Sequence, residues 1–327
     1  MNPRRTLQAG STIVGFLLLV ALAAPLLSND KPIIVRQSDG RVRYPALADY
    51  PLPTGWRVRL AGDPSRWSQG DGGARLILPA LIPYSATRTN LDAILQPPGA
   101  DHWMGTDALG RDIAARMVRG TVVSLTVGIS AMLVSLVIGV SLGSLAGYFG
   151  GPVDTAISRI IEVVFCFPTL FLILALVGIL DAAGILPIVV AIGVTRWTGM
   201  ARYVRGEFLS LRERDFVRSA RAAGASHARI IFRYILPHSW NPVLVTAAFG
   251  VSGAVLLEAA LSFLGFGIQP PLPTWGNILT EAQAALGSAW WLLLWPAAGI
   301  FLTVLGFNLL GEGFRDALDP RRGRTHS

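Results

Sequence analysis

Long apolar runs without charge are the feature that most constrains how this chain can fold. A helix needs about 20 mainly apolar residues to cross the roughly 30 Å hydrocarbon core of a bilayer. Four runs that contain no Asp, Glu, Lys or Arg approach or exceed this length: residues 6–29, 121–153, 163–180 and 282–311. Each of them predicts a transmembrane helix.

Two weaker candidates bring the predicted number of spans to six. Residues 184–201 include Arg196 near their end, where a long side chain can reach the headgroups, and residues 242–265 include Glu258. Glu258 either lines a path or packs inside the bundle, and both interpretations stay open. A mean hydropathy of +0.52 with 15% charged residues excludes an ordinary soluble domain of this length. We therefore predict an all-α membrane protein.

The arginines set the orientation of these spans. Arg4 and Arg5 precede the first span, residues 202–233 hold eight arginines against three acids, and further arginines occur in the tail, at Arg321, Arg322 and Arg324. With six spans all three groups fall on one side, and the opposite short loops, 181–183 and 266–281, contain no Lys or Arg. The positive-inside rule then places both termini in the cytoplasm. The net charge of +8 thus reflects topology and not nucleic-acid binding.

The first span has an alternative interpretation. Arg4-Arg5, an apolar core and Ala21-Leu22-Ala23 also fit a cleaved signal peptide. Cleavage would leave the orientation unchanged, so this alternative stays open.

The sequence divides into four regions. We expect an N-terminal tail with the first helix, an external insert with an amphipathic helix, a five-helix domain that includes a cytoplasmic loop at about 202–240, and a cytoplasmic tail: residues 1–27, 28–120, 121–320 and 321–327. The insert is rich in Pro and Gly and should be mostly irregular. Residues 33–35 and 42–44 flank Asp39-Gly40, which predicts a short hairpin. Three tryptophans of the insert could anchor at the membrane interface, contact a docking partner or pack within the insert, with packing as the default: Trp56, Trp67 and Trp103.

The end of the insert predicts an amphipathic helix on the outer surface before the second span. Thr106 or Asp107 can cap it, and one apolar face is formed by Leu109, Ile113 and Met117. Asp107, Asp112 and His102 could hold a metal. Capping and pairing with Arg111 or Arg116 explain the same residues more simply, so we assign no metal site.

Small residues and prolines mark helices that pack against each other. Gly139, Gly143 and Gly147 recur every fourth residue and place three bare backbone patches on one helix face. Prolines in or beside the spans, which bend helices and need neighbouring partners, are Pro168, Pro187, Pro242 and Pro296.

The loop at 202–240 carries the strongest functional signal. Residues 207–223 favour a helix that Gly224 ends, Ser226 can cap a second helix, and Pro237 should stop it. Apolar residues beneath a basic exterior suit docking onto another protein: Phe208, Leu211, Phe216, Val217, Ile230, Ile231 and Ile235. A loop that folds back on its own bundle is the alternative.

Motifs in this loop and elsewhere resemble a known family. Ser219-Ala220-Arg221-Ala222-Ala223-Gly224, followed by Ile235-Leu236-Pro237, is similar to the EAA loop of binding-protein-dependent ABC importers. Over about residues 102–320 the chain resembles the C-type subunit of dipeptide and oligopeptide permeases, through the segments 105–112, 147–151, 261–265, 273–277 and 316–320. The start of the insert, Ser28 to Pro32, resembles the subgroup with an enlarged external loop, which includes microcin C permeases.

This resemblance implies a type I importer permease in a bacterial inner membrane. It implies pairing with a second permease subunit, two ATP-binding subunits that carry ATP and Mg, and a periplasmic substrate-binding protein. The coupling residues would be Arg218, Ser219, Ala220, Arg221, Gly224, Ile235, Leu236 and Pro237. The family's usual loop glutamate aligns with Arg218, which puts a carboxylate contact to the ATP-binding subunit in doubt. Glu213, Asp215 or a partner acid could replace it.

Other functions leave few traces in the sequence. The only Lys, Lys31, precedes Pro32, so there is no Walker-type phosphate loop, and we expect no cofactor on this chain. All four histidines fall outside the predicted spans, so no catalytic residues are assigned, and Cys166 suits a buried small hydrophobe. An ion- or proton-coupled carrier or channel is the alternative, with Glu258 as its only mid-span candidate. Nickel or glutathione transport within the family also stays open.

Overall fold

The computed structural model describes residues 3–36, 42–49, 75–180 and 184–318 and is mainly helical. The hairpin turn, Trp56, Trp67, the 181–183 loop and the arginines of the tail lie outside these residues. Contacts divide the chain into two compact units, each described here by itself. The first unit comprises Met1–Gly15, Thr126–Leu261 and Phe301–Ser327, and the second comprises Phe16–Leu125 and Ser262–Ile300.

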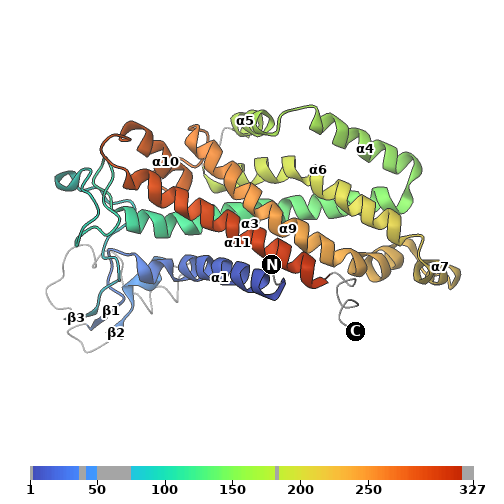
Figure 1. Cartoon of the computed structure of the whole chain (residues 1–327), viewed down its shortest axis with the longest axis horizontal. Coiled ribbons are helices and arrows are strands. Elements are labelled where there is room, and N and C mark those ends of the chain that lie inside the picture. The colour runs from blue at the N-terminus through green and yellow to red at the C-terminus, as the bar shows by residue number, and fades with distance from the viewer. Residues whose placement is uncertain (1–2, 37–41, 50–74, 181–183, 319–327) are drawn as a thin grey trace. The chain divides into compact units, whose positions relative to one another are not determined.

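Ten α-helices are defined in the described residues, together with short 3-10, π and strand segments (Figure 1). In chain order they are α1 (Pro3–Leu27), α3 (Ile113–Phe149), α4 (Gly151–Phe165), α5 (Thr169–Leu180), α6 (Ile185–Leu211), α7 (Asp215–Ala222), α8 (His227–Arg229), α9 (Leu236–Phe263), α10 (Trp275–Ala284) and α11 (Trp291–Leu318). Five described helices are long and apolar enough to cross a membrane. A sixth span results if the bent pair α4 and α5 is counted as one, which agrees with the predicted six-span architecture.

The third predicted span, 163–180, is not a single helix. Helix α4 ends at Phe165, α5 begins at Thr169, and the two helices are bent by 91° (Figure 1). Pro168 has no amide hydrogen and disfavours helical geometry in the residue before it, which explains the break. With 12 residues, α5 extends about 18 Å and is too short to cross a bilayer alone.

The predicted surface helix before the second span is the first part of a longer helix. Helix α3 continues for 37 residues from Ile113 to Phe149. Its cap is Asp112, whose side chain accepts a hydrogen bond of 2.7 Å from the amide of Ala115, and not Thr106 or Asp107. Leu109 lies before the helix, so the proposed face of Leu109, Ile113 and Met117 does not form. Buried ion pairs of Arg116, described below, explain why a charged residue is tolerated there.

The fourth and sixth predicted spans also differ from the structure in their bounds. Helix α6 continues to Leu211, ten residues beyond the predicted end, so Arg196 lies near its middle and not near an end. The last span begins at Trp291, because Thr274 starts a separate helix, α10, through a capping box with Asn277.

The insert in the second unit contains a small antiparallel sheet. Strand β1 (Ile34–Arg36) pairs with β2 (Val42–Arg43), with Val35 opposite Arg43, as the predicted hairpin requires. Strand β3 (Arg75–Leu78) pairs with the other edge of β1, which gives the order β2-β1-β3. The third strand was not predicted, because the partner of β1 comes from about 40 residues later in the chain.

Candidate functional site

The candidate site lies in the first unit, where the loop after α6 meets the end of α3. Helix α7 buries Val217 and Ala220 and exposes Arg218, Ser219 and Arg221. At its end the Gly224 amide donates to the Arg221 carbonyl (3.0 Å) and the Ala225 amide to the Ala220 carbonyl (3.1 Å). This is the Schellman arrangement, and it needs the positive φ of +78° that Gly224 adopts. The predicted Gly joint therefore forms.

A second helical segment begins two residues after this joint and runs without interruption into α9. The Ser226 side chain accepts from the Arg229 amide (3.4 Å), as predicted for a cap. Residues Ile230–Ile235 form a π-helix, and the Leu236 amide bonds back to the Ile231 carbonyl. The prediction that Pro237 ends the helix is wrong, because this wider turn accommodates a residue that lacks an amide hydrogen and clashes with the preceding α-turn. The result is one continuous helix, here called the rod, from His227 to Phe263.

Most apolar residues of this loop form its core and do not offer a docking surface. Five of the seven that were expected to supply apolar surface are buried: Phe208, Val217, Ile230, Ile231 and Ile235. The outward face is polar, with exposed Arg214, Asp215, Arg218 and Arg221, and Arg218 approaches Glu213 at 3.3 Å. Of the other predicted coupling residues, Leu236 is half-buried and Pro237 is exposed.

The end of α3 is held by this loop through two contacts. The Arg212 guanidinium donates to the carbonyls of Gly147 (3.1 Å) and Tyr148 (3.4 Å), which places a cation at the negative end of the helix dipole. The Tyr148 hydroxyl is 2.8 Å from Nδ1 of His227, and the two rings lie edge to face. A displacement of the loop would therefore act on α3 and, through the continuous helix, on α9. Arg212 and His227 were not assigned from the sequence, because their partners lie 64 to 79 residues away.

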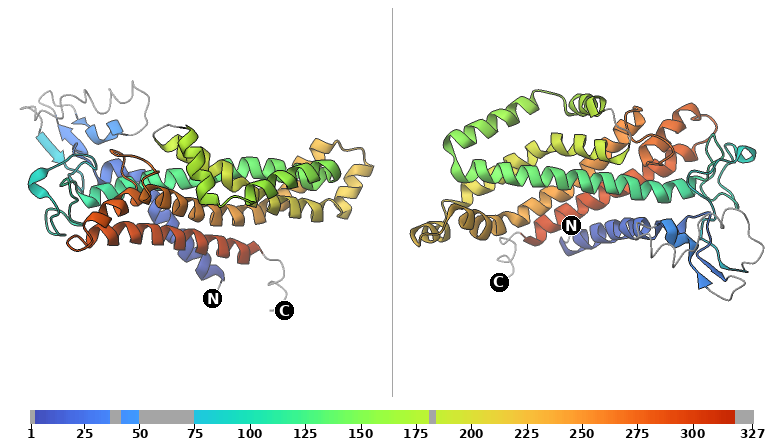
Figure 2. Two further views of the ribbon diagram at one scale, coloured as in Figure 1. Left: turned by 90° about the horizontal axis from the view of Figure 1, so that it is seen from above. Right: turned by 180° about the vertical axis from the view of Figure 1, so that it is seen from behind.

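The predicted glycine face of α3 lies against α6 (Figure 2). A Cβ atom at Gly139 would be 2.6 Å from Cβ of Met200, one at Gly143 would be 2.5 Å from the Ala201 carbonyl oxygen, and one at Gly147 would be 2.6 Å from Cβ of Phe208. Real Cβ atoms do not approach so closely. The two helices can be in contact at these points only because the three positions lack side chains.

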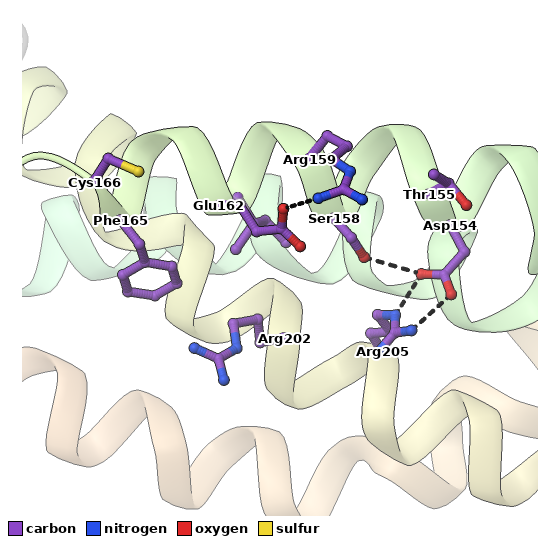
Figure 3. Close-up of a pocket in the computed structure, with 10 residues that line it drawn as sticks. Asp154, Thr155, Ser158, Arg159, Glu162, Phe165, Cys166, Arg202 and Arg205 are labelled. Carbon is purple, nitrogen blue, oxygen red and sulfur yellow. Dashed lines mark hydrogen bonds and ion pairs between the residues drawn. The ribbon is translucent and has the colours of Figure 1, made fainter.

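An open cavity of about 800 Å³ lies between α4 and α6 (Figure 3). Asp154 pairs with Arg205 through both carboxylate oxygens, and Ser158 donates to the same carboxylate (3.3 Å). Arg159 pairs with Glu162 (2.6 Å), and the Arg202 guanidinium lies 5.2 Å from the centre of the Phe165 ring. Cys166 lines this cavity and is exposed, so the interpretation as a buried hydrophobe is wrong. Within the parts of the chain that the structure describes, no three His, Cys, Asp or Glu residues are grouped to hold a metal.

The second unit contains a buried charge cluster of Asp107, Arg111, Arg116 and Glu281. Arg111 contacts Asp107 (2.6 Å) and Glu281 (2.8 Å), while Arg116 contacts Glu281 (2.6 Å) and also Asp107. Asp112 instead pairs with His102 (2.8 Å). Asp107 is thus engaged with both arginines, as the simpler interpretation proposed, whereas the partner of Asp112 is His102 and not an arginine. Glu281 was missed, because nothing local marks it as the partner of residues about 170 positions earlier.

Glu258 on α9 is fully buried. Its role in a pathway or in packing stays a prediction.

Comparison with known proteins agrees with the motifs of the loop. Residues 139–324 match the family of binding-protein-dependent transport system inner membrane components. The dipeptide transport system permease protein DppC of Alkalihalophilus pseudofirmus is 43% identical over 246 residues, which cover 75% of this chain and 81% of that protein. The glutathione transport system permease protein GsiD of Pectobacterium atrosepticum is 43% identical, covering 74% and 80%. The oligopeptide transport system permease protein OppC of Bacillus subtilis is 38% identical, covering 75% and 80%.

Solved structures show the same fold. An inward-facing structure of the MetNI methionine ABC transporter superposes with a TM-score of 0.52 at 18% identity, covering 63% of this chain and 98% of the matched chain. An amino acid ABC transporter gives 0.50 at 19% identity, covering 63% and 95%. The fold is therefore the predicted type I ABC importer permease fold. With these relatives and the family match over more than half of its length, the chain belongs to the binding-protein-dependent transport system inner membrane components.

Proposed function

We propose that this chain forms half of the translocation pathway of an ATP-driven, binding-protein-dependent importer of dipeptides, oligopeptides or peptide-like solutes. The similar proteins are named for dipeptide, oligopeptide and glutathione transport, and all three solutes are peptides or peptide-like. This shared chemistry favours a peptide over nickel as the solute.

The observation that carries the proposal is the contact between the loop and two long helices. The loop contacts the end of α3 through Arg212 and His227, and it continues without a break into α9. A rigid connection of this kind is what transmits movement from a motor subunit to a helix bundle. The exposed charges of α7, among them Arg218 and Arg221, suit a partner surface with complementary acids.

The partners follow from this role. A second permease subunit completes the pathway, two ATP-binding subunits hold ATP and Mg and dock on the loop, and a periplasmic binding protein delivers the solute. This chain itself carries out no hydrolysis. Its place is the bacterial inner membrane with both termini in the cytoplasm, which the arginines on one side of the spans support.

Substitution of Gly224 tests the coupling role. A Cβ atom at Gly224 would meet no atom within 4 Å, so a substitution there acts through the backbone alone. Gly224→Val should raise the conformational energy of the backbone at this positive φ by about 1–2 kcal/mol. Uptake per ATP hydrolysed should then fall, measured in proteoliposomes that contain all partner subunits. Gly224→Asn is the matched control and should keep the wild-type ratio, because Asn tolerates this conformation. Gly224→Asp adds a negative charge among the arginines and should lower uptake per ATP hydrolysed while membrane insertion is unchanged.

An ion-coupled carrier is the alternative function. Uptake by the purified chain without an ATP-binding subunit would support that alternative and contradict the proposal. A wild-type ratio of uptake to hydrolysis in Gly224→Val would instead remove only the coupling role.

A further inference from the structure

Arg196 lies near the middle of α6, a helix long and apolar enough to span a membrane, and forms no ion pair with the residues that the structure describes. It comes eleven residues after the start of α6 and fifteen before its end, or about 16 and 22 Å along the helix. Its side chain is half-buried and makes no hydrogen bond or ion pair with any described residue. A charge at this depth costs on the order of 3 kcal/mol or more unless it faces water or a counter-charge. The open side of Arg196 therefore needs a polar neighbour.

The guanidinium of Arg196 lies against the backbone of α9. A Cβ atom at Gly253 would be 2.7 Å from Nη2 and 2.9 Å from Nη1 of Arg196. The hydroxyl of Thr195, the residue before Arg196, is occupied by carbonyls of its own helix, Ala191 and Ile192. The contact at Gly253 thus fixes where the guanidinium sits but leaves its hydrogen-bond donors unused.

Residues of α6, α9 and α11 line an open cavity further along the same face. It has a volume of about 450 Å³, and its lining includes Tyr203, Asn241, Thr246, Phe249 and Arg315. Tyr203 follows Arg196 by two helical turns, and Phe249 precedes Gly253 by about one turn, so both helices continue this face to the arginine. Of the described residues that line the cavity, none is acidic. The lining of this cavity therefore combines Arg315, an aromatic wall and neutral donors, and Arg196 lies beyond it, two helical turns from Tyr203 along α6.

We propose that Arg196 binds the carboxylate of the transported peptide as a specificity residue, beside the groove that this cavity forms. The inference rests on the proposed function, since an unmodified linear peptide carries a C-terminal carboxylate. Guanidinium groups bind carboxylates through two parallel hydrogen bonds, which gives geometric selectivity. A phospholipid phosphate is the other anion available to a membrane protein. The two sources of the anion are separated by the lipid measurement in the test below.

The test compares peptides that differ only at the carboxylate. The complete importer with its binding protein is reconstituted in liposomes, and uptake of a peptide acid and its C-terminal amide is measured for wild type and Arg196→Gln. Any preference of the binding protein is the same for both permeases and cancels in the ratio. Arg196→Gln should lower acid uptake about tenfold or more and leave amide uptake unchanged, because a charged hydrogen bond is lost. Arg196→Lys should restore part of the acid uptake.

Control measurements separate this inference from structural effects and from the proposed function. Arg88→Gln, an exposed arginine of the second unit outside the groove, should leave the acid-to-amide ratio unchanged. Equal losses for acid and amide in Arg196→Gln, or no loss, would overturn the inference. Loss of copurified anionic lipid without a change in the ratio would assign the groove to lipid and also overturn it. If wild type imports neither peptide with ATP, it is the proposed function that fails.

Discussion

The glycine seam between α3 and α6 and the charge cluster of the second unit hold their helices in opposite ways. In the seam, Gly139, Gly143 and Gly147 let the backbones touch through van der Waals contacts that have no fixed direction. In the cluster, Asp107 and Arg116 are almost fully buried and joined by hydrogen bonds of fixed geometry. Van der Waals contacts tolerate small sliding movements, whereas a buried ion pair loses its stabilisation when it shifts. We therefore expect movement along the seam and rigidity in the cluster.

The largest effect should come from breaking the cluster. Arg116→Met leaves the carboxylate of Asp107 buried with one cation fewer and should lower the free energy of unfolding by about 3–5 kcal/mol. Denaturation of the purified protein in detergent measures this change. Arg159→Gln removes an exposed pair and should cost about 1 kcal/mol or less. Similar losses of unfolding free energy in the two variants would show that the buried cluster stabilises the protein no more than an exposed ion pair does.

A substitution in the seam should have the next largest effect. Gly143→Leu places a side chain where the Ala201 carbonyl lies, and overpacking should cost about 1–3 kcal/mol. Gly206→Leu on α6 is the control, because a Cβ atom there meets nothing within 4 Å. The same stability assay measures both variants. A destabilised control with an unaffected Gly143→Leu would contradict the close approach of the two helices.

The smallest expected effect is at the end of the seam. Tyr148→Phe removes the hydrogen bond to His227 and should cost about 1 kcal/mol of stability. We also expect a modest decrease in uptake per ATP hydrolysed, since α3 is then held to the loop by Arg212 alone. Unchanged stability together with unchanged coupling would remove this contact from the transmission path.

The fold was largely predictable because its signals are local. Uncharged runs located the spans, and Gly224 and Ser226 marked a positive φ and a helix cap that the structure contains. These properties depend on neighbouring residues or on composition, which a sequence displays directly.

The errors arose where distant residues decide the outcome. Glu281 was not predicted as a partner of Arg116, because it comes 165 residues later in the chain. Pro237 was expected to end a helix, and only the widened turn before it explains why the helix continues. Likewise, neither Arg212 nor His227 carries a local sign that its partner is the end of α3.

The π-helix at Ile230–Ile235 constrains the length of the chain itself. A π turn holds one residue more than an α turn, and here that extra residue absorbs the disturbance from Pro237 while the rod stays continuous over 37 residues. Deleting one residue would restore ordinary pitch but press the proline ring against a carbonyl, and adding one would rotate everything beyond it by about 100°. Insertions and deletions should therefore be tolerated in the connections around this helix and rejected within it.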